Sequence, residues 1–144
     1  MVERKMAGEI HKLRDRQSET EKITINVGFV DLGHIDLLVR EGFYSNRTDF
    51  IRTAIRNQLA SHAEAVKQSI VRHTLELGLR RVSRQELEAA RAKGVRLQIQ
   101  VVGLATIDDD VTPELARETI ESITVLGALH ARKEIKTALD DRIR

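Results

Sequence analysis

The sequence has no cysteine, and none of its 144 residues falls in an apolar run long enough to cross a membrane. The absence of cysteine excludes a disulfide framework and a cysteine nucleophile. A membrane-spanning helix needs about 20 mainly apolar residues. Residues 1–22 are mixed in charge and have no apolar centre, which argues against a secretory signal. We therefore expect a cytoplasmic protein with no membrane partner.

Motifs that would indicate an enzyme are also absent from the sequence. It contains no glycine-rich phosphate loop, and no Ser, His and acid that the pattern brings together. The acidic run Asp108–Asp110 lacks the ligand spacing of a calcium loop, so we interpret it as a solvated turn. The five histidines are dispersed: His11, His34, His62, His73 and His130. We expect no catalytic residue, no cofactor and no metal site.

Residues 22–27, with the sequence KITINV, alternate strictly between polar and apolar side chains. Because successive strand residues point to opposite sides, this predicts a strand with two different faces. The apolar face carries Ile23, Ile25 and Val27. The polar face carries Lys22, Thr24 and Asn26. A lone short strand has no partner in its own unit, so we expect it to pair antiparallel with the same strand of a second chain.

Two short amphipathic helices are predicted after this strand. Apolar residues repeat along the first at Leu32, Ile35, Leu38 and Val39. Gly42 then ends it, since glycine suits a left-handed helix terminus. The second begins near Arg47, with Ser45 or Asn46 as its cap and Asp49 as the acidic member of a capping box. The apolar stripe of the second helix consists of Phe50, Ile51, Ala54, Ile55 and Leu59.

Residues 21–59 resemble the ribbon-helix-helix repressors, the family that includes the methionine and Arc repressors. The residues that carry the resemblance are Lys22–Val27, Gly42–Arg52 and Ala54–Arg56. It implies a homodimer whose two-stranded ribbon enters the major groove of double-stranded DNA. The bases would be read by Lys22, Thr24 and Asn26. A phosphate would be bound at the start of the second helix by Ser45, Asn46 and Arg47. One departure is Gly28–Asp31, where many members have proline and acidic residues.

The charge distribution is compatible with DNA binding although the net charge is only +2. Residues 46–93 contain ten Lys or Arg against five Asp or Glu, whereas residues 94–144 contain seven against nine. Phosphate binding requires such a local excess, although scattered arginines more often form a solvated helix face. Basic residues of the amino-terminal arm that could touch flanking phosphates are Arg4, Lys5, Lys12, Arg14 and Arg16.

Beyond the resemblance, the pattern predicts helices and then a change to strands. Apolar residues spaced by three and four from Leu59 to Leu77 predict a continuing helix that ends at Gly78, with His73 in its packing seam. Ser83 and Glu86 form a capping box for another helix, which stops at Gly94. Residues 95–107 then alternate as a long strand.

The last third of the sequence looks like a repeated strand and helix. Residues 99–107 align with 123–131 at a shift of 24 residues, which places Gly103 and Gly127 in equivalent positions. Thr112 and Pro113 begin the helix between these strands, and a final helix covers about 132–142. The intervening helix predicts parallel strands with a right-handed crossover. Two strands are too few for a stable sheet, so we expect their edges to be covered or joined to another subunit.

We therefore predict an α+β protein with an arm at 1–20, a ribbon-helix-helix unit at 21–60, a helical connector at 61–94 and a β-α-β-α unit at 95–144. The predicted function is transcriptional regulation, with repression as the expected direction and higher oligomers formed through residues 95–144. The alternative is an antitoxin whose carboxyl-terminal half binds a toxin. A separately folding carboxyl-terminal half favours assembly or sensing, and one that stays unfolded without a toxin favours the antitoxin.

Overall fold

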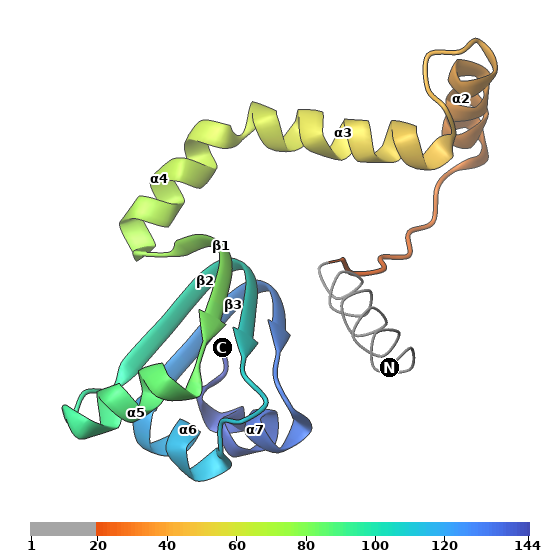
Figure 1. Ribbon diagram of the computed structural model, residues 1–144. Helices are drawn as coiled ribbons and strands as arrows, with labels where there is room; N and C mark the ends of the chain where they lie inside the picture. The colour runs from red at the N-terminus through yellow and green to blue at the C-terminus, as the bar shows by residue number, and fades with distance from the viewer. Residues whose placement is uncertain (1–19) are drawn as a thin grey trace, which may run out of the picture. The chain divides into compact units, whose positions relative to one another are not determined.

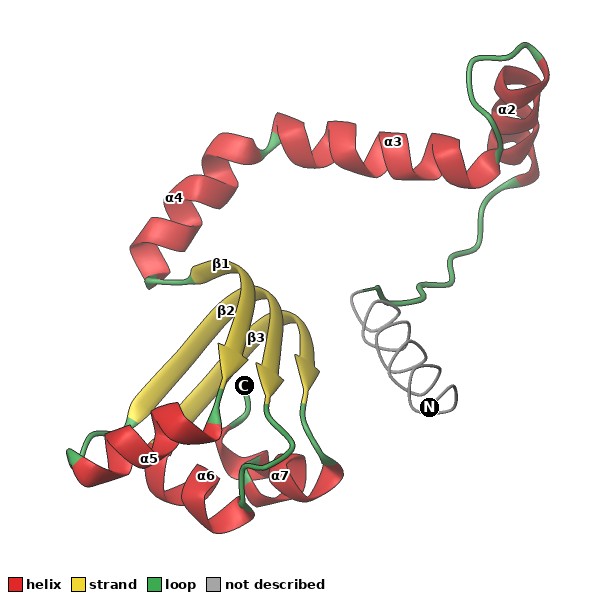
Figure 2. Cartoon of the chain, viewed as in Figure 1, coloured by secondary structure: helices red, strands yellow, loops and turns green. Residues whose placement is uncertain are grey.

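A computed structural model describes residues 20–144 of the chain (Figures 1 and 2). This part of the chain forms six α-helices, three strands and one 3-10 helix, which confirms a mixed α+β fold. The chain divides into two compact units, Met1–Ala63 and Glu64–Arg144. None of the helices in residues 20–144 is long and apolar enough to cross a membrane.

The described part of the amino-terminal unit consists of an extended segment and two helices, α2 (Phe29–Arg40) and α3 (Arg47–Ser61). Helix α2 ends as the sequence predicts, because Gly42 adopts a φ of 84°. The amide of Gly42 donates to the Val39 carbonyl at 3.1 Å, and that of Phe43 to the Leu38 carbonyl at 3.0 Å. This pair of hydrogen bonds satisfies carbonyls that the helix end would otherwise leave free.

Helix α4 (Ala63–His73) belongs to the carboxyl-terminal unit from Glu64 onward, and strand β1 (Glu76–Val82) follows it. The expected continuous helix to Leu77 is therefore wrong at both ends of α4. Helix α3 stops at Ser61, and Thr74, with a φ of 54°, ends α4 four residues before Gly78. The spacing fitted a helix, but Leu77 and Leu79 also alternate as a strand, and pairing with a strand far along the chain decides between the two.

Three strands and three helices then alternate along the chain. Their bounds are β1 (Glu76–Val82), α5 (Arg84–Ala92), β2 (Leu97–Ile107), α6 (Pro113–Thr119), β3 (Ile120–His130) and α7 (Lys133–Ala138), with the 3-10 helix η1 at Asp140–Arg142. All strand pairs are parallel, in the order β1-β2-β3. The predicted parallel pair thus has a third strand, β1, on one side, and the helix predicted after Ser83 is α5, which connects β1 to β2.

One face of the sheet forms the core of the carboxyl-terminal unit. Side chains from alternate strand positions, such as Val101 and Ile123, pack against Leu87 of α5, Leu115 of α6 and Ile135 of α7. The helices therefore lie together on this face (Figure 2). The predicted caps are confirmed, since the side chains of Ser83 and Thr112 accept from the amides of Glu86 and Leu115, each at 3.2 Å.

Candidate nucleic-acid interface

The segment that should form the ribbon, Lys22–Val27, has no secondary structure in the single chain and is exposed along its whole length. Its apolar residues Ile23 and Ile25 are 81% and 64% exposed. The polar residues Lys22, Thr24 and Asn26 are exposed as well. Residues 20–144 of a single chain therefore supply neither a strand partner nor a cover for the apolar face of this segment.

The two helices of the same unit also bury little. Among its described residues, Ile35 of α2 is the only buried hydrophobic residue, at 8% exposed. The rings of Tyr44 and Phe50 pack edge to face, with 5.0 Å between centroids, and so connect the turn to α3. Large apolar side chains that stay exposed here include Phe29, Val30, Leu37, Phe43, Ile55 and Leu59.

The predicted phosphate site lies at the start of α3. The Asn46 side chain caps the helix by accepting from the Asp49 amide at 2.8 Å. The Asp49 carboxylate accepts from the Ser45 amide at 2.9 Å, so the capping box reaches one residue further back than its usual form. The amides of Arg47 and Thr48, at the first two helical positions, have no partner within the helix. Free amides at a helix start favour an anion.

The side chain of Arg47 is held by a residue that the sequence analysis did not single out. Its Nε and Nη2 donate to the two carboxylate oxygens of Asp36, on α2, at 2.7 and 2.8 Å. This guanidinium lowers the pKa of Asp36, and the carboxylate raises that of Arg47, chiefly through these hydrogen bonds. Eleven positions separate the two residues, so only the packing of α2 on α3 brings them together.

Comparison with known families decides what kind of protein carries this unit. Residues 18–136 match the ribbon-helix-helix transcriptional regulator family. The chain belongs to that family. The ribbon-helix-helix family implies DNA binding and dimerisation, and its regulators are normally not enzymes. Comparisons of this ribbon-helix-helix chain with curated proteins and with solved structures give no match.

The basic residues of this ribbon-helix-helix regulator fall into several groups. The arm residues Arg4, Lys5, Lys12, Arg14 and Arg16 lie outside the described residues. Within residues 20–144, no hydrogen bond joins the three residues predicted to read bases to the three predicted to bind a phosphate in the same chain. Part of the central excess of basic residues serves the carboxyl-terminal unit instead, where Arg80, Arg81 and Arg84 pair with carboxylates.

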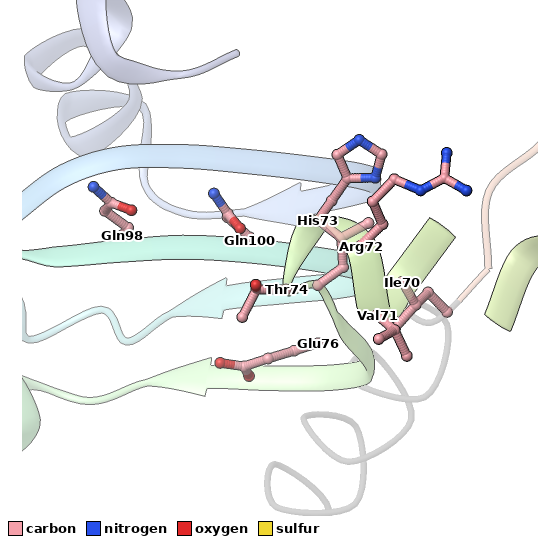
Figure 3. Close-up of a pocket in the computed structure, with 9 residues that line it drawn as sticks. Ile70, Val71, Arg72, His73, Thr74, Glu76, Gln98 and Gln100 are labelled. Atoms are coloured by element: carbon pink, nitrogen blue, oxygen red, sulfur yellow. The ribbon is translucent and has the colours of Figure 1, made fainter. Parts of the chain in front are cut away.

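The carboxyl-terminal unit of the regulator has an open depression of about 700 Å³ at the start of β1 (Figure 3). Its lining includes Arg72, His73 and Thr74 together with Gln98 and Gln100 of β2. The Nδ1 atom of His73 lies 2.9 Å from the Ser69 backbone oxygen, within its own helix, so this histidine has a local partner. No group of three or more His, Asp or Glu in residues 20–144 is placed to hold a metal ion.

Proposed function

We propose that this chain is a transcriptional repressor that binds a specific operator as a homodimer. The strands Lys22–Val27 of two chains pair antiparallel, and the resulting ribbon enters the major groove. In this arrangement the bases are read by Lys22, Thr24 and Asn26. The flanking phosphates are held at the start of α3 by Ser45, Asn46 and Arg47. The observation that carries the proposal is the exposed, alternating segment from residue 22 to residue 27.

The dimer follows from what one chain leaves uncovered. Ile23 and Ile25 lose contact with water only if another apolar surface covers them, and the same segment of a second chain supplies one. Antiparallel pairing also gives the backbone of each strand its hydrogen-bond partner. With the apolar face turned to the helices of both chains, the polar face is left for DNA. Lysine, threonine and asparagine can all hydrogen-bond to base edges.

Phosphate binding at α3 relies first on the backbone. The amides of Arg47 and Thr48 point from a helix start, where the helix dipole also favours an anion. The Arg47 side chain is shared, because Asp36 already occupies its guanidinium. It therefore adds a charged contact to DNA only when a phosphate competes successfully with Asp36. Asn46 keeps its role as the cap and positions the amides rather than contacting the phosphate with its side chain.

The antitoxin alternative receives less support from the carboxyl-terminal unit. That unit buries its own core in a single chain, including Val82, Leu87 and Ile123, each 0% exposed. A tail that wraps a toxin needs its apolar residues free for the toxin. An independent core instead favours a unit that assembles with other subunits or senses an effector.

Alanine substitutions on the polar ribbon face test base reading. Lys22→Ala, Thr24→Ala and Asn26→Ala should each weaken binding to the operator by about 1–3 kcal/mol, because each removes a base contact. The operator is first selected from genomic fragments, and titrations by fluorescence anisotropy then compare it with random DNA. Lys67→Ala, on the exposed surface of α4, is the matched control and should change neither affinity. Equal losses on operator and random DNA would show that these residues do not read sequence.

A further inference from the structure

The parallel sheet of the carboxyl-terminal unit has two outer edges that are mostly unpaired. Strand β1 pairs only with β2, so no strand in residues 20–144 lies along its other side. The outer side of β3 carries a single isolated bridge, between Ile123 and Ile143. An unpaired edge presents a row of amides and carbonyls that can accept another strand.

A row of three glycines gives these edges complementary shapes. Gly78, Gly103 and Gly127 pair with one another across the sheet and have φ values of 115°, 139° and 125°. A Cβ added to Gly103 would lie 2.1 Å from the Gly78 carbonyl oxygen, and one added to Gly127 would lie 2.0 Å from the Gly103 oxygen. Each carbonyl thus fills the space where the next strand would carry a side chain.

The two glycines at the ends of the row, Gly78 and Gly127, each lack one such carbonyl–glycine contact on the outer side of the sheet. No atom lies within 4 Å of the Cβ position at Gly78. At the other end, the Ile123 carbonyl accepts from the Arg144 amide at 2.8 Å, so it points to the outer side of β3. Carbonyls of alternate strand residues point the same way, and that of Gly127 therefore points outward too. Strand β3 offers a carbonyl, and β1 offers the space that receives one.

The register leaves room for a second β1 beside β3. Glu76, the first residue of β1, pairs with Val101, which in turn pairs with Val125 of β3. A second β1 in the same register would begin beside Val125. The bridge to Ile143 lies at Ile123, before that point, so the two contacts use different parts of the edge.

Exposed leucines on the face opposite the core lie at these same edges. Leu77 and Leu79 of β1 are 70% and 74% exposed, and Leu126 of β3 is 59% exposed. The residues between them on β2, Val102 and Leu104, are partly buried because they have neighbours on both sides. Continuing the register places Leu77 of a second chain beside Leu126, where both would lose contact with water.

We propose that the carboxyl-terminal unit binds a second copy of itself head to tail, with β1 of one chain parallel to β3 of another and Gly78 beside Gly127. Such a contact is heterologous, so it does not close on itself as a two-fold interface does. The ribbon closes the dimer, and the sheet edges join one dimer to the next. Dimers bound at adjacent operator sites would then bind cooperatively.

The test is the mass of the full-length protein in sedimentation velocity over a wide range of concentration. As the concentration rises, the wild type should form species heavier than the dimer. Leu77→Lys and Leu126→Glu should each weaken the association between dimers at least tenfold, because a charge then meets an apolar edge. The dimer itself should stay intact. In the double variant the association between dimers should return to within about threefold of the wild type, since the lysine and the glutamate become neighbours. Val71→Lys, at a 74% exposed position on α4, is the control.

A second pair of substitutions keeps the test valid if one variant of the first pair fails to fold. Circular dichroism would reveal such a folding defect. Leu79→Lys and Ala128→Glu occupy the next matching positions in the same register. A wild type that remains a dimer at every concentration would overturn the proposal. Association of dimers that persists in all four single variants, or that fails to return in both double variants, would also overturn it. Binding to one isolated operator should be unchanged throughout, so failure here is distinct from failure of the proposed DNA reading.

Discussion

The two units of this chain differ in how much apolar surface a single copy can bury. In the carboxyl-terminal unit, residues such as Leu87 and Ile123 are fully buried between the sheet and its helices. In the described part of the amino-terminal unit, only Ile35 is a buried hydrophobic residue, while Ile23 and Phe29 remain almost fully exposed. The carboxyl-terminal unit therefore completes its core in a single copy, whereas the amino-terminal unit requires a second chain.

The largest effect is expected from breaking the shared core of the ribbon. Ile25→Ala should weaken the dimer by about 3–6 kcal/mol, because the dimer contains two such side chains at about 1.5–3 kcal/mol each. Sedimentation equilibrium measures the shift toward monomer. Thr24→Ala, the next residue on the opposite face, should leave the dimer intact. If both substitutions change the mass equally, the two faces of the segment are not distinct.

A smaller effect is expected in the carboxyl-terminal core, and it should not depend on dimerisation. Leu87→Ala should destabilise that unit by about 2–5 kcal/mol, because it removes a fully buried side chain and leaves a cavity. Urea unfolding followed by circular dichroism gives the loss. Val71→Ala, at an exposed position on α4, should change stability by less than about 0.5 kcal/mol. A loss for Leu87→Ala that varies with protein concentration would mean that this unit, too, depends on a partner.

The smallest effect concerns two matched ion pairs, one in each unit. Arg47 binds Asp36 through both carboxylate oxygens, and Arg81 binds Asp108 in the same way. The arginine lowers the pKa of the carboxyl group in each pair, so both pairs are ionised at neutral pH. Asp36→Asn releases Arg47 for a phosphate, and the slope of log affinity against log salt should steepen by about one.

Asp108→Asn is the control for that measurement. It changes the net charge of the chain by the same amount but releases an arginine of the carboxyl-terminal unit. Its salt slope should equal that of the wild type. Identical slopes for both variants would show that releasing Arg47 from Asp36 adds no phosphate contact.

Features set by neighbouring residues could be predicted from the sequence. The glycine that ends α2 and the caps Asn46, Ser83 and Thr112 occur where the pattern placed them, because each depends on hydrogen bonds within a few positions. The apolar alternation of β2 and β3 identified both strands for a similar reason. Strand length and side-chain alternation are local properties of the chain.

Features set by distant contacts could not be predicted in the same way. Strand β1 reads equally well as the end of a helix, and only its pairing with β2, from Glu76 opposite Val101 onward, makes it a strand. The sequence did not indicate Asp36 as the partner of Arg47, because the two residues meet through the packing of α2 on α3 and not through a fixed spacing along one element. The base-reading and phosphate-binding assignments stay predictions, since they depend on a second chain and on DNA.

The strands of the carboxyl-terminal unit lie side by side in the order in which they occur along the chain, and this order affects where the unit unfolds first. Each strand contacts mainly the next strand and each helix the next helix, as in repeat proteins. Both β1 and β3 are edge strands, but β1 pairs with β2 over a shorter length than β3 does, and only β3 has a bridge on its outer side. Local unfolding therefore begins most easily at β1, while β2 and β3 stay paired. Since β1 follows directly after α4, the strand nearest in sequence to the DNA-binding half is the one that detaches at least cost. Amide hydrogen exchange would register this as a gradient of protection that rises from β1 toward β2.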